Sequence, residues 1–72
     1  MIWFFEREQD LVVCEVRKTD DESAYEFELA PSNAPPAVQH FISPGDLIEA
    51  YLKEQKRLLS EGWHPRTTLE AN

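Results

Sequence analysis

The sequence has 72 residues, of which 42% are hydrophobic, and 14 acidic against 7 basic side chains give it a net charge of −7. This length suits one small domain, and no apolar stretch approaches the roughly 20 residues that span a bilayer. Residues 1–42 hold nine acids and only three bases. This charge argues against nucleic-acid and anionic membrane partners, which both require clustered Lys and Arg.

The chain has a single cysteine, Cys14, so an intrachain disulfide is excluded. The apolar start is too short for a secretory signal, because Glu6 and Arg7 interrupt it at once. A reducing compartment is the usual location of proteins with this cysteine content. We therefore expect a cytoplasmic protein.

Short segments with the composition of β-strands alternate with polar or proline-containing breaks. They span residues 2–8, 11–18, 24–30 and 37–42. Two-residue turns at residues 9–10 and 20–21 would pair Phe5 with Cys14 and Cys14 with Phe27. Both turns place one set of side chains on the same face, as a consistent register should. That face carries Trp3, Phe5, Val12, Cys14, Val16, Tyr25, Phe27 and Leu29.

The opposite face of the predicted sheet is apolar toward the first strand and acidic toward the third. Its apolar residues, the candidate interface, are Ile2, Phe4, Leu11 and Val13. In the same register Glu15 lies opposite Glu26, which is unfavourable unless a cation or a partner intervenes. Because one helix covers only one face, we expect a second copy of the chain to cover the apolar part.

The segment Ala30 to Ala37, which contains Pro31, Pro35 and Pro36, is expected to break the third strand and form an exposed loop. The facing of the strand after this loop stays open. Either the set Val38, His40 and Ile42 points inward, or the set Ala37, Gln39 and Phe41 does.

An amphipathic helix follows. Ser43 is a suitable N-cap, Pro44 suits the first helical position, and Gly62 suits the left-handed position after the last turn. The helix is about 18 residues long, roughly 27 Å, and Trp63 is placed to pack on Leu58. Its apolar side chains fall within an arc of about 140°. They are Leu47, Ile48, Tyr51, Leu52, Leu58 and Leu59.

Gln55 lies near the centre of that apolar arc, where an unpaired amide costs roughly 1–3 kcal/mol. It either reaches a backbone group at a sheet edge, or the helix is slightly rotated, or it faces a cleft or a partner subunit. A small-ligand pocket would then gather the polar spot of Gln55, His40 and Tyr51.

Few residues suggest chemistry. Both glycines, Gly45 and Gly62, are explained by the helix ends, so no glycine-rich phosphate loop exists. Cys14 could be combined with His40 or His64 as a nucleophile or a zinc site, but it points into the predicted core and lacks ligand spacing. We predict no catalytic, cofactor-binding or metal-binding residue, and no enzyme.

The opening Met-Ile-Trp-Phe-Phe-Glu-Arg, the strands after it and the closing Leu-Leu-Ser-Glu-Gly-Trp resemble short bacterial proteins of unknown function, over residues 1–63. This resemblance implies no site and no activity. The order ββββα is also similar to the repeat unit of Whirly-type single-stranded DNA binders, an analogy of fold alone. Those proteins use basic and aromatic groove residues, whereas this sheet half is acidic.

The sequence therefore predicts an α+β fold, a four-stranded antiparallel meander with one C-terminal helix across one face. The domain covers residues 1–63, and residues 64–72 form a flexible tail. The predicted function is a non-catalytic protein interaction or assembly module that forms a homodimer through the outer sheet face. A hetero-partner on that face, a single-stranded nucleic-acid binder and a small-ligand domain are the alternatives.

Overall fold

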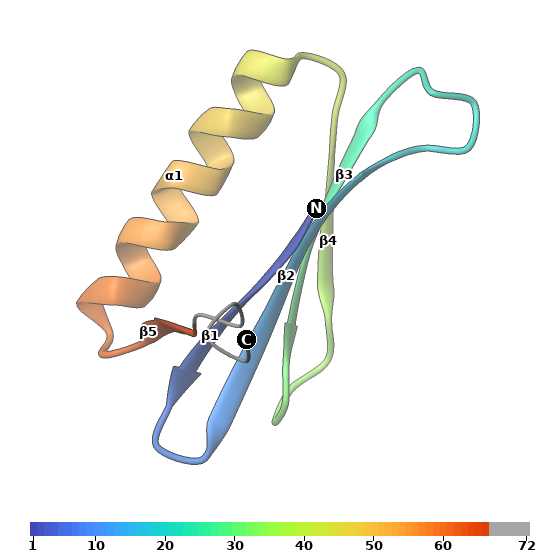
Figure 1. Ribbon diagram of the computed structural model, residues 1–72. Coiled ribbons are helices and arrows are strands. Elements are labelled where there is room, and N and C mark those ends of the chain that lie inside the picture. Colours follow the sequence, from blue (N-terminus) through green and yellow to red (C-terminus); the bar gives the residue numbers. More distant parts are fainter. Residues whose placement is uncertain (67–72) are drawn as a thin grey trace, which may run out of the picture.

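The computed structural model describes residues 1–66, which form an antiparallel sheet with one helix packed on one of its faces (Figure 1). The strands are β1 (Ile2–Arg7), β2 (Asp10–Lys18), β3 (Tyr25–Pro31), β4 (Ala37–Phe41) and β5 (His64–Arg66), and the helix α1 spans Pro44–Ser60. Their order across the sheet is β4-β3-β2-β1-β5. The predicted meander with a C-terminal helix is confirmed.

The first hairpin has a different register from the predicted one. Phe5 pairs with Val12 rather than with Cys14, and Arg7 pairs with Asp10 across a two-residue turn. Glu8 occupies this turn with φ 55°, a left-handed conformation that a glutamate rarely adopts. The observed register therefore differs from the predicted one by two residues. Because side chains alternate with period two, every residue still lies on the predicted face.

The second hairpin is also displaced by two residues, but in the opposite direction, since Val16 pairs with Phe27 and Cys14 with Leu29. Its loop is wider than the predicted two-residue turn and is closed by the amide of Thr19, which donates to the carbonyl of Ala24 (3.0 Å). Asp21 accepts hydrogen bonds from the Ser23 amide, the Thr19 hydroxyl and the Ser23 hydroxyl. These bonds lower the pKa of Asp21 to about 2.

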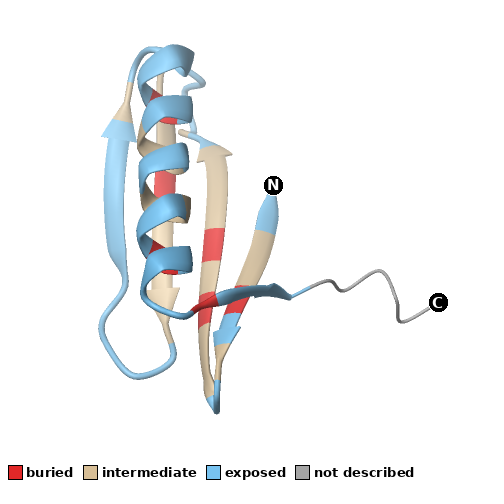
Figure 2. Ribbon diagram, turned by 90° about the vertical axis from the view of Figure 1, so that its left-hand side faces the viewer, coloured by how far each residue is buried: buried red, intermediate tan, exposed pale blue. Residues whose placement is uncertain are grey.

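The core lies between α1 and the inner face of the sheet (Figure 2). Its buried members are Phe5, Val12, Cys14, Phe27, Leu47, Leu58 and Trp63. Trp3 and Tyr51 extend this core, with ring centroids 4.9 Å apart in an edge-to-face arrangement. The predicted inner face of the sheet is therefore the face that the helix covers.

Both ends of α1 form the predicted caps. The Ser43 hydroxyl accepts from the Asp46 amide at the first turn. At the other end Gly62, at φ 93°, donates its amide to Leu59, and Trp63 donates to Leu58. This pair of bonds is the Schellman arrangement, and it places the buried Trp63 ring against the core.

The chain after the helix continues as a strand, which corrects the prediction of a flexible tail from residue 64. Pro65 pairs with Phe5, an arrangement that an edge strand tolerates because its outward groups need no ladder partner. The guanidinium of Arg7 lies over the Trp63 ring, 4.4 Å from its centroid, and donates to the Glu61 carbonyl. These contacts bring the chain back alongside β1. Residues 67–72 of the predicted tail lie outside the described residues.

The pairing of β4 with β3 decides which of its side chains face the helix. Phe41 pairs with Tyr25 and Gln39 with Phe27, so the set Ala37, Gln39 and Phe41 shares the inner face. Val38 and His40 lie on the outer face, and Ile42 follows the strand in an exposed position. Within residues 1–66, the helix does not have the length and apolar character needed to cross a membrane.

Candidate protein interaction surface

The outer face of the sheet is the side that α1 does not cover (Figures 1 and 2). Phe5 and Val12 are buried beneath the helix, so their neighbours along the strands point outward. Ile2 and Phe4 reach this face from β1, and Leu11 and Val13 reach it from β2. The structure thus brings all members of the predicted interface together on one face.

Apolar side chains from β1, β2 and β3 form a continuous row on this face. Phe4 pairs with Val13, and Val13 pairs with Ala30 of β3. Together with Ile2 and Leu11 they form a surface that we call the apolar patch, comprising Ile2, Phe4, Leu11, Val13 and Ala30. Ile2 is exposed and the others are half-buried by their neighbours in the sheet. Arg66 of β5 pairs with Phe4 and closes the row at its other end.

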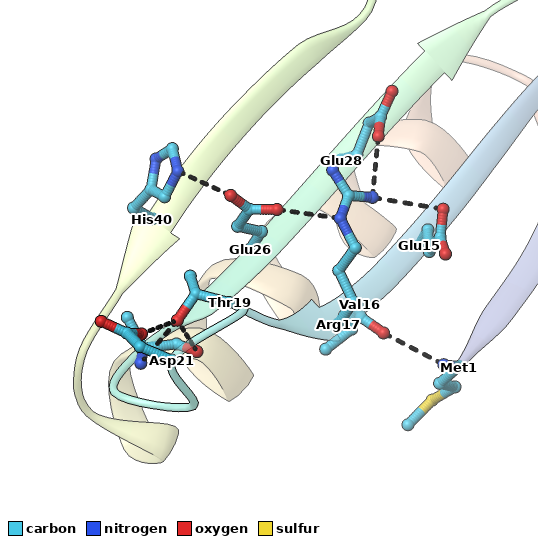
Figure 3. Close-up of polar contacts among 10 residues, drawn as sticks. Met1, Glu15, Val16, Arg17, Thr19, Asp21, Glu26, Glu28 and His40 are labelled. Carbon is cyan, nitrogen blue, oxygen red and sulfur yellow. Dashed lines mark hydrogen bonds and ion pairs between the residues drawn. The ribbon is translucent and has the colours of Figure 1, made fainter.

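A network of charges adjoins the patch and is centred on Arg17 (Figure 3). The Arg17 Nε donates to Glu26 (2.8 Å), and its Nη1 donates to Glu28 (2.9 Å) and to Glu15 (3.2 Å). The second carboxylate oxygen of Glu26 lies 3.0 Å from Nε2 of His40. We call these five residues the Arg17 network.

The register explains why the network forms. Glu15 lies opposite Glu28 rather than opposite Glu26, and Arg17 lies opposite Glu26. The expected repulsion between two glutamates is therefore present, but Arg17 supplies the cation that relieves it. Hydrogen bonds from Arg17, and then from His40, lower the pKa of Glu26 below its ordinary value. Bonding to Glu28, and then to Glu26, raises the pKa of Arg17.

The residues of the predicted polar spot are not brought together. His40 lies on the outer face of β4 beside Glu26. Tyr51 lies on the inner side, where its ring contacts Trp3 and Phe27, and Gln55 is half-buried on α1. The sheet separates His40 from the other two, so no single ligand pocket contains all three.

Cys14 is buried in the core. Burial, and then the charge of Glu54, raises the pKa of its thiol to about 11, so the thiol stays protonated at neutral pH. The prediction that Cys14 is a core side chain is confirmed. Within residues 1–66, no group of three His, Cys, Asp or Glu side chains is placed to hold a metal ion.

An apolar groove of about 280 Å³ lies between the start of the chain and the first half of α1. It is lined by Met1, Trp3, Val16, Leu47, Ile48, Tyr51 and Leu52. The buried indole N–H of Trp3 has no hydrogen-bond partner among the described residues. Sequence reasoning missed this groove, although Ile48 and Leu52 lie at one border of the apolar arc and could have indicated it.

Neither a scan against protein-family models nor searches of curated proteins and of solved structures found a match for this chain. The resemblance to short bacterial proteins and the analogy to Whirly-type binders therefore stay predictions. A function can therefore be inferred only from the geometry and the charges of the surface.

Proposed function

We propose that this protein is a non-catalytic interaction module that self-associates through the outer face of its sheet. The observation that carries the proposal is the apolar patch, which spans β1, β2 and β3 on a face that α1 does not cover. Contiguous apolar surface bordered by polar side chains is typical of protein interfaces. The charges of this face favour a second copy of the chain as the partner.

The charges of the outer face are distributed unequally across the strands. Arg66 lies at the β5 end of the apolar row, whereas Glu28 and Glu26 lie on β3. Two sheets that pack face to face lie about 10 Å apart with their strands nearly aligned. A two-fold axis parallel to the strands, between β1 and β2, then lays β5 of each chain over β3 of the other. This rotation keeps each residue at its level along the strands, so Arg66 lies over Ala30 of the second copy, two residues from Glu28 on β3, while the two apolar patches meet.

The same face disfavours the nucleic-acid alternative. The Arg17 network contains three carboxylates and one guanidinium, with His40 at its border. A phosphate backbone would meet net negative charge where nucleic-acid binders present Lys and Arg. A second copy, by contrast, brings its own Arg66 over β3, two residues from Glu28.

The test of the proposal is the mass in solution, measured by light scattering after gel filtration at high protein concentration. Phe4→Lys places a charge at the centre of the apolar patch, and we expect it to halve the mass of the assembly. Val38→Lys is the matched control, because Val38 is an exposed apolar residue of the same face on the edge strand β4. It should leave the mass unchanged.

Circular dichroism should show both variants to be folded. A wild-type chain that runs as a single copy at every concentration would refute the proposal. An unchanged mass for Phe4→Lys would refute it as well.

A further inference from the structure

The helix α1 exposes a second line of apolar side chains, separate from the line that it buries. Leu47 and Leu58 face the core. Ile48, Leu52 and Leu59 remain 56%, 55% and 47% exposed, and Ile48 and Leu52 border the groove beside Met1 and Trp3 at the start of the chain. With Gln55 they follow one another at steps of four, three and four residues. This is the a/d spacing of a coiled coil, and we call these four residues the helix seam.

We infer that a second copy of the chain packs its own α1 antiparallel against the helix seam. This contact goes beyond the proposed function, because it uses the side of the sheet opposite to the apolar patch (Figure 1). In an antiparallel pair, a positions lie opposite d positions. Ile48 of one chain then lies opposite Leu59 of the other, and Leu52 lies opposite Gln55.

Charges beside the seam favour the antiparallel orientation. Glu49 and Lys56 each follow a d position, so they flank the seam on the side away from the sheet. Among the described residues, neither has an ion-pair partner within 4.0 Å. An antiparallel pair brings Glu49 of each chain beside Lys56 of the other, which forms two equivalent ion pairs. A parallel pair would set Lys56 beside Tyr51 and leave both charges without a partner.

The groove beside the seam offers a place for a side chain of the second copy. Ile48 and Leu52 belong both to the seam and to the wall of the 280 Å³ groove, whose opposite wall is formed by Met1 and Trp3. Leu59 of the second copy, in the layer of Ile48, enters this groove. Each chain thus offers a ridge and a groove, as an isologous contact demands.

Gln55 acquires a role in the same arrangement. It is half-buried in the middle of the seam, and its amide makes no side-chain hydrogen bond within residues 1–66. A single polar residue in such a seam fixes the register and orientation of the helices at a cost in stability. In this arrangement Gln55 faces the partner subunit, opposite Leu52 of the second copy.

The seam and the apolar patch lie on opposite sides of the sheet, so both contacts can form at once. A chain with two different two-fold contacts closes most simply into an assembly of four copies with dihedral symmetry. Loss of either contact leaves a pair, and loss of both leaves a single chain.

The test compares variants of the full chain by light scattering, with circular dichroism to confirm that each is folded. Leu52→Lys should halve the mass, and Leu52→Lys with Phe4→Lys should reduce it to that of one chain. Ile42→Lys is the matched control, because Ile42 is 82% exposed and belongs to neither surface. It should leave the mass unchanged. If Leu52→Lys leaves the wild-type mass, the inference is overturned.

Charge exchange tests the orientation of the helices. Glu49→Lys and Lys56→Glu should each weaken the helix contact, because each sets like charges side by side. The double variant should restore it, whereas Lys53→Glu, a charge reversal elsewhere on α1, should have no effect. A double variant that dissociates as much as either single variant would overturn the antiparallel arrangement. If Leu52→Lys halves the mass but Phe4→Lys leaves it unchanged, the outer-face proposal fails while the helix contact stands.

Discussion

The two faces of the sheet are built from alternate residues of the same strands, yet they are stabilised in different ways. On the inner face, Phe5, Val12, Cys14 and Phe27 are buried against α1. On the outer face, no side chain among residues 1–66 reaches that degree of burial, and Arg17 there is hydrogen-bonded to three glutamates of the Arg17 network. We therefore expect inner residues to determine whether the chain folds, and we propose that outer residues determine what the folded chain contacts.

Adjacent phenylalanines on β1 provide the strongest test of this difference. Phe5 is 2% exposed, so Phe5→Lys would bury an unpaired charge and lose the ring from the core. Removing a buried Phe costs about 3–5 kcal/mol even without the charge, a large share of the roughly 5–15 kcal/mol that stabilises a domain. We expect Phe5→Lys to unfold the chain, as measured by circular dichroism and urea titration. Phe4→Lys should keep the fold, and equal loss of structure in both variants would refute the assignment of faces.

Adjacent leucines on α1 repeat the comparison on the helix. Leu58 is 3% exposed and Leu59 is 47% exposed. Leu58→Ala should lower the free energy of unfolding by about 2–5 kcal/mol, because it leaves a cavity in the core. Leu59→Ala should change the free energy of unfolding by about 0.5 kcal/mol or less when the chain is dilute. Urea titrations at low protein concentration measure both, and similar losses would mean that the helix is rotated differently on the sheet.

The faces were predictable from the sequence, whereas the register was not. Side chains alternate with period two, so a displacement of two residues leaves each of them on its own face. The turn at Glu8 could not be anticipated, since its left-handed backbone contradicts the local preference of glutamate. The strand β5 was also missed, because Pro65 argues against a ladder and its pairing with Phe5 depends on contacts distant in sequence.

The candidate surfaces were predictable to different degrees. Four members of the apolar patch follow from alternation alone and were named from the sequence, whereas Ala30 joins the patch through its pairing with Val13. The Arg17 network could not, because the position of a long guanidinium side chain depends on the register that places Glu15 opposite Glu28. The helix seam required one further fact. Ile48 and Leu58 fall in one apolar arc of the sequence, and only packing on the sheet decides that Leu58 is buried and Ile48 is exposed.

Disrupting the Arg17 network should have the smallest effect on stability, and this effect should depend most on pH. Arg17→Met removes the cation shared by Glu15, Glu26 and Glu28, leaving like charges side by side on neighbouring strands. We expect the pKa of Glu26 to rise, because its lowering depends first on Arg17. A lowered pKa stabilises the folded chain above the ordinary glutamate pKa, and this stabilisation is lost as pH falls through the lowered value.

The variant should therefore be less stable than the wild type near pH 7, and the difference should shrink once the glutamates are protonated. Urea titrations at neutral and acidic pH, with NMR titration of the Glu26 carboxyl, measure both effects. A Lys variant at position 17 is the control, since it keeps the charge but lacks the forked donor that reaches several carboxylates. If Arg17→Met were equally destabilised at both pH values, the loss would come from packing of the arginine stem. The outer face would then be stabilised by packing, as the inner face is, rather than by its charges.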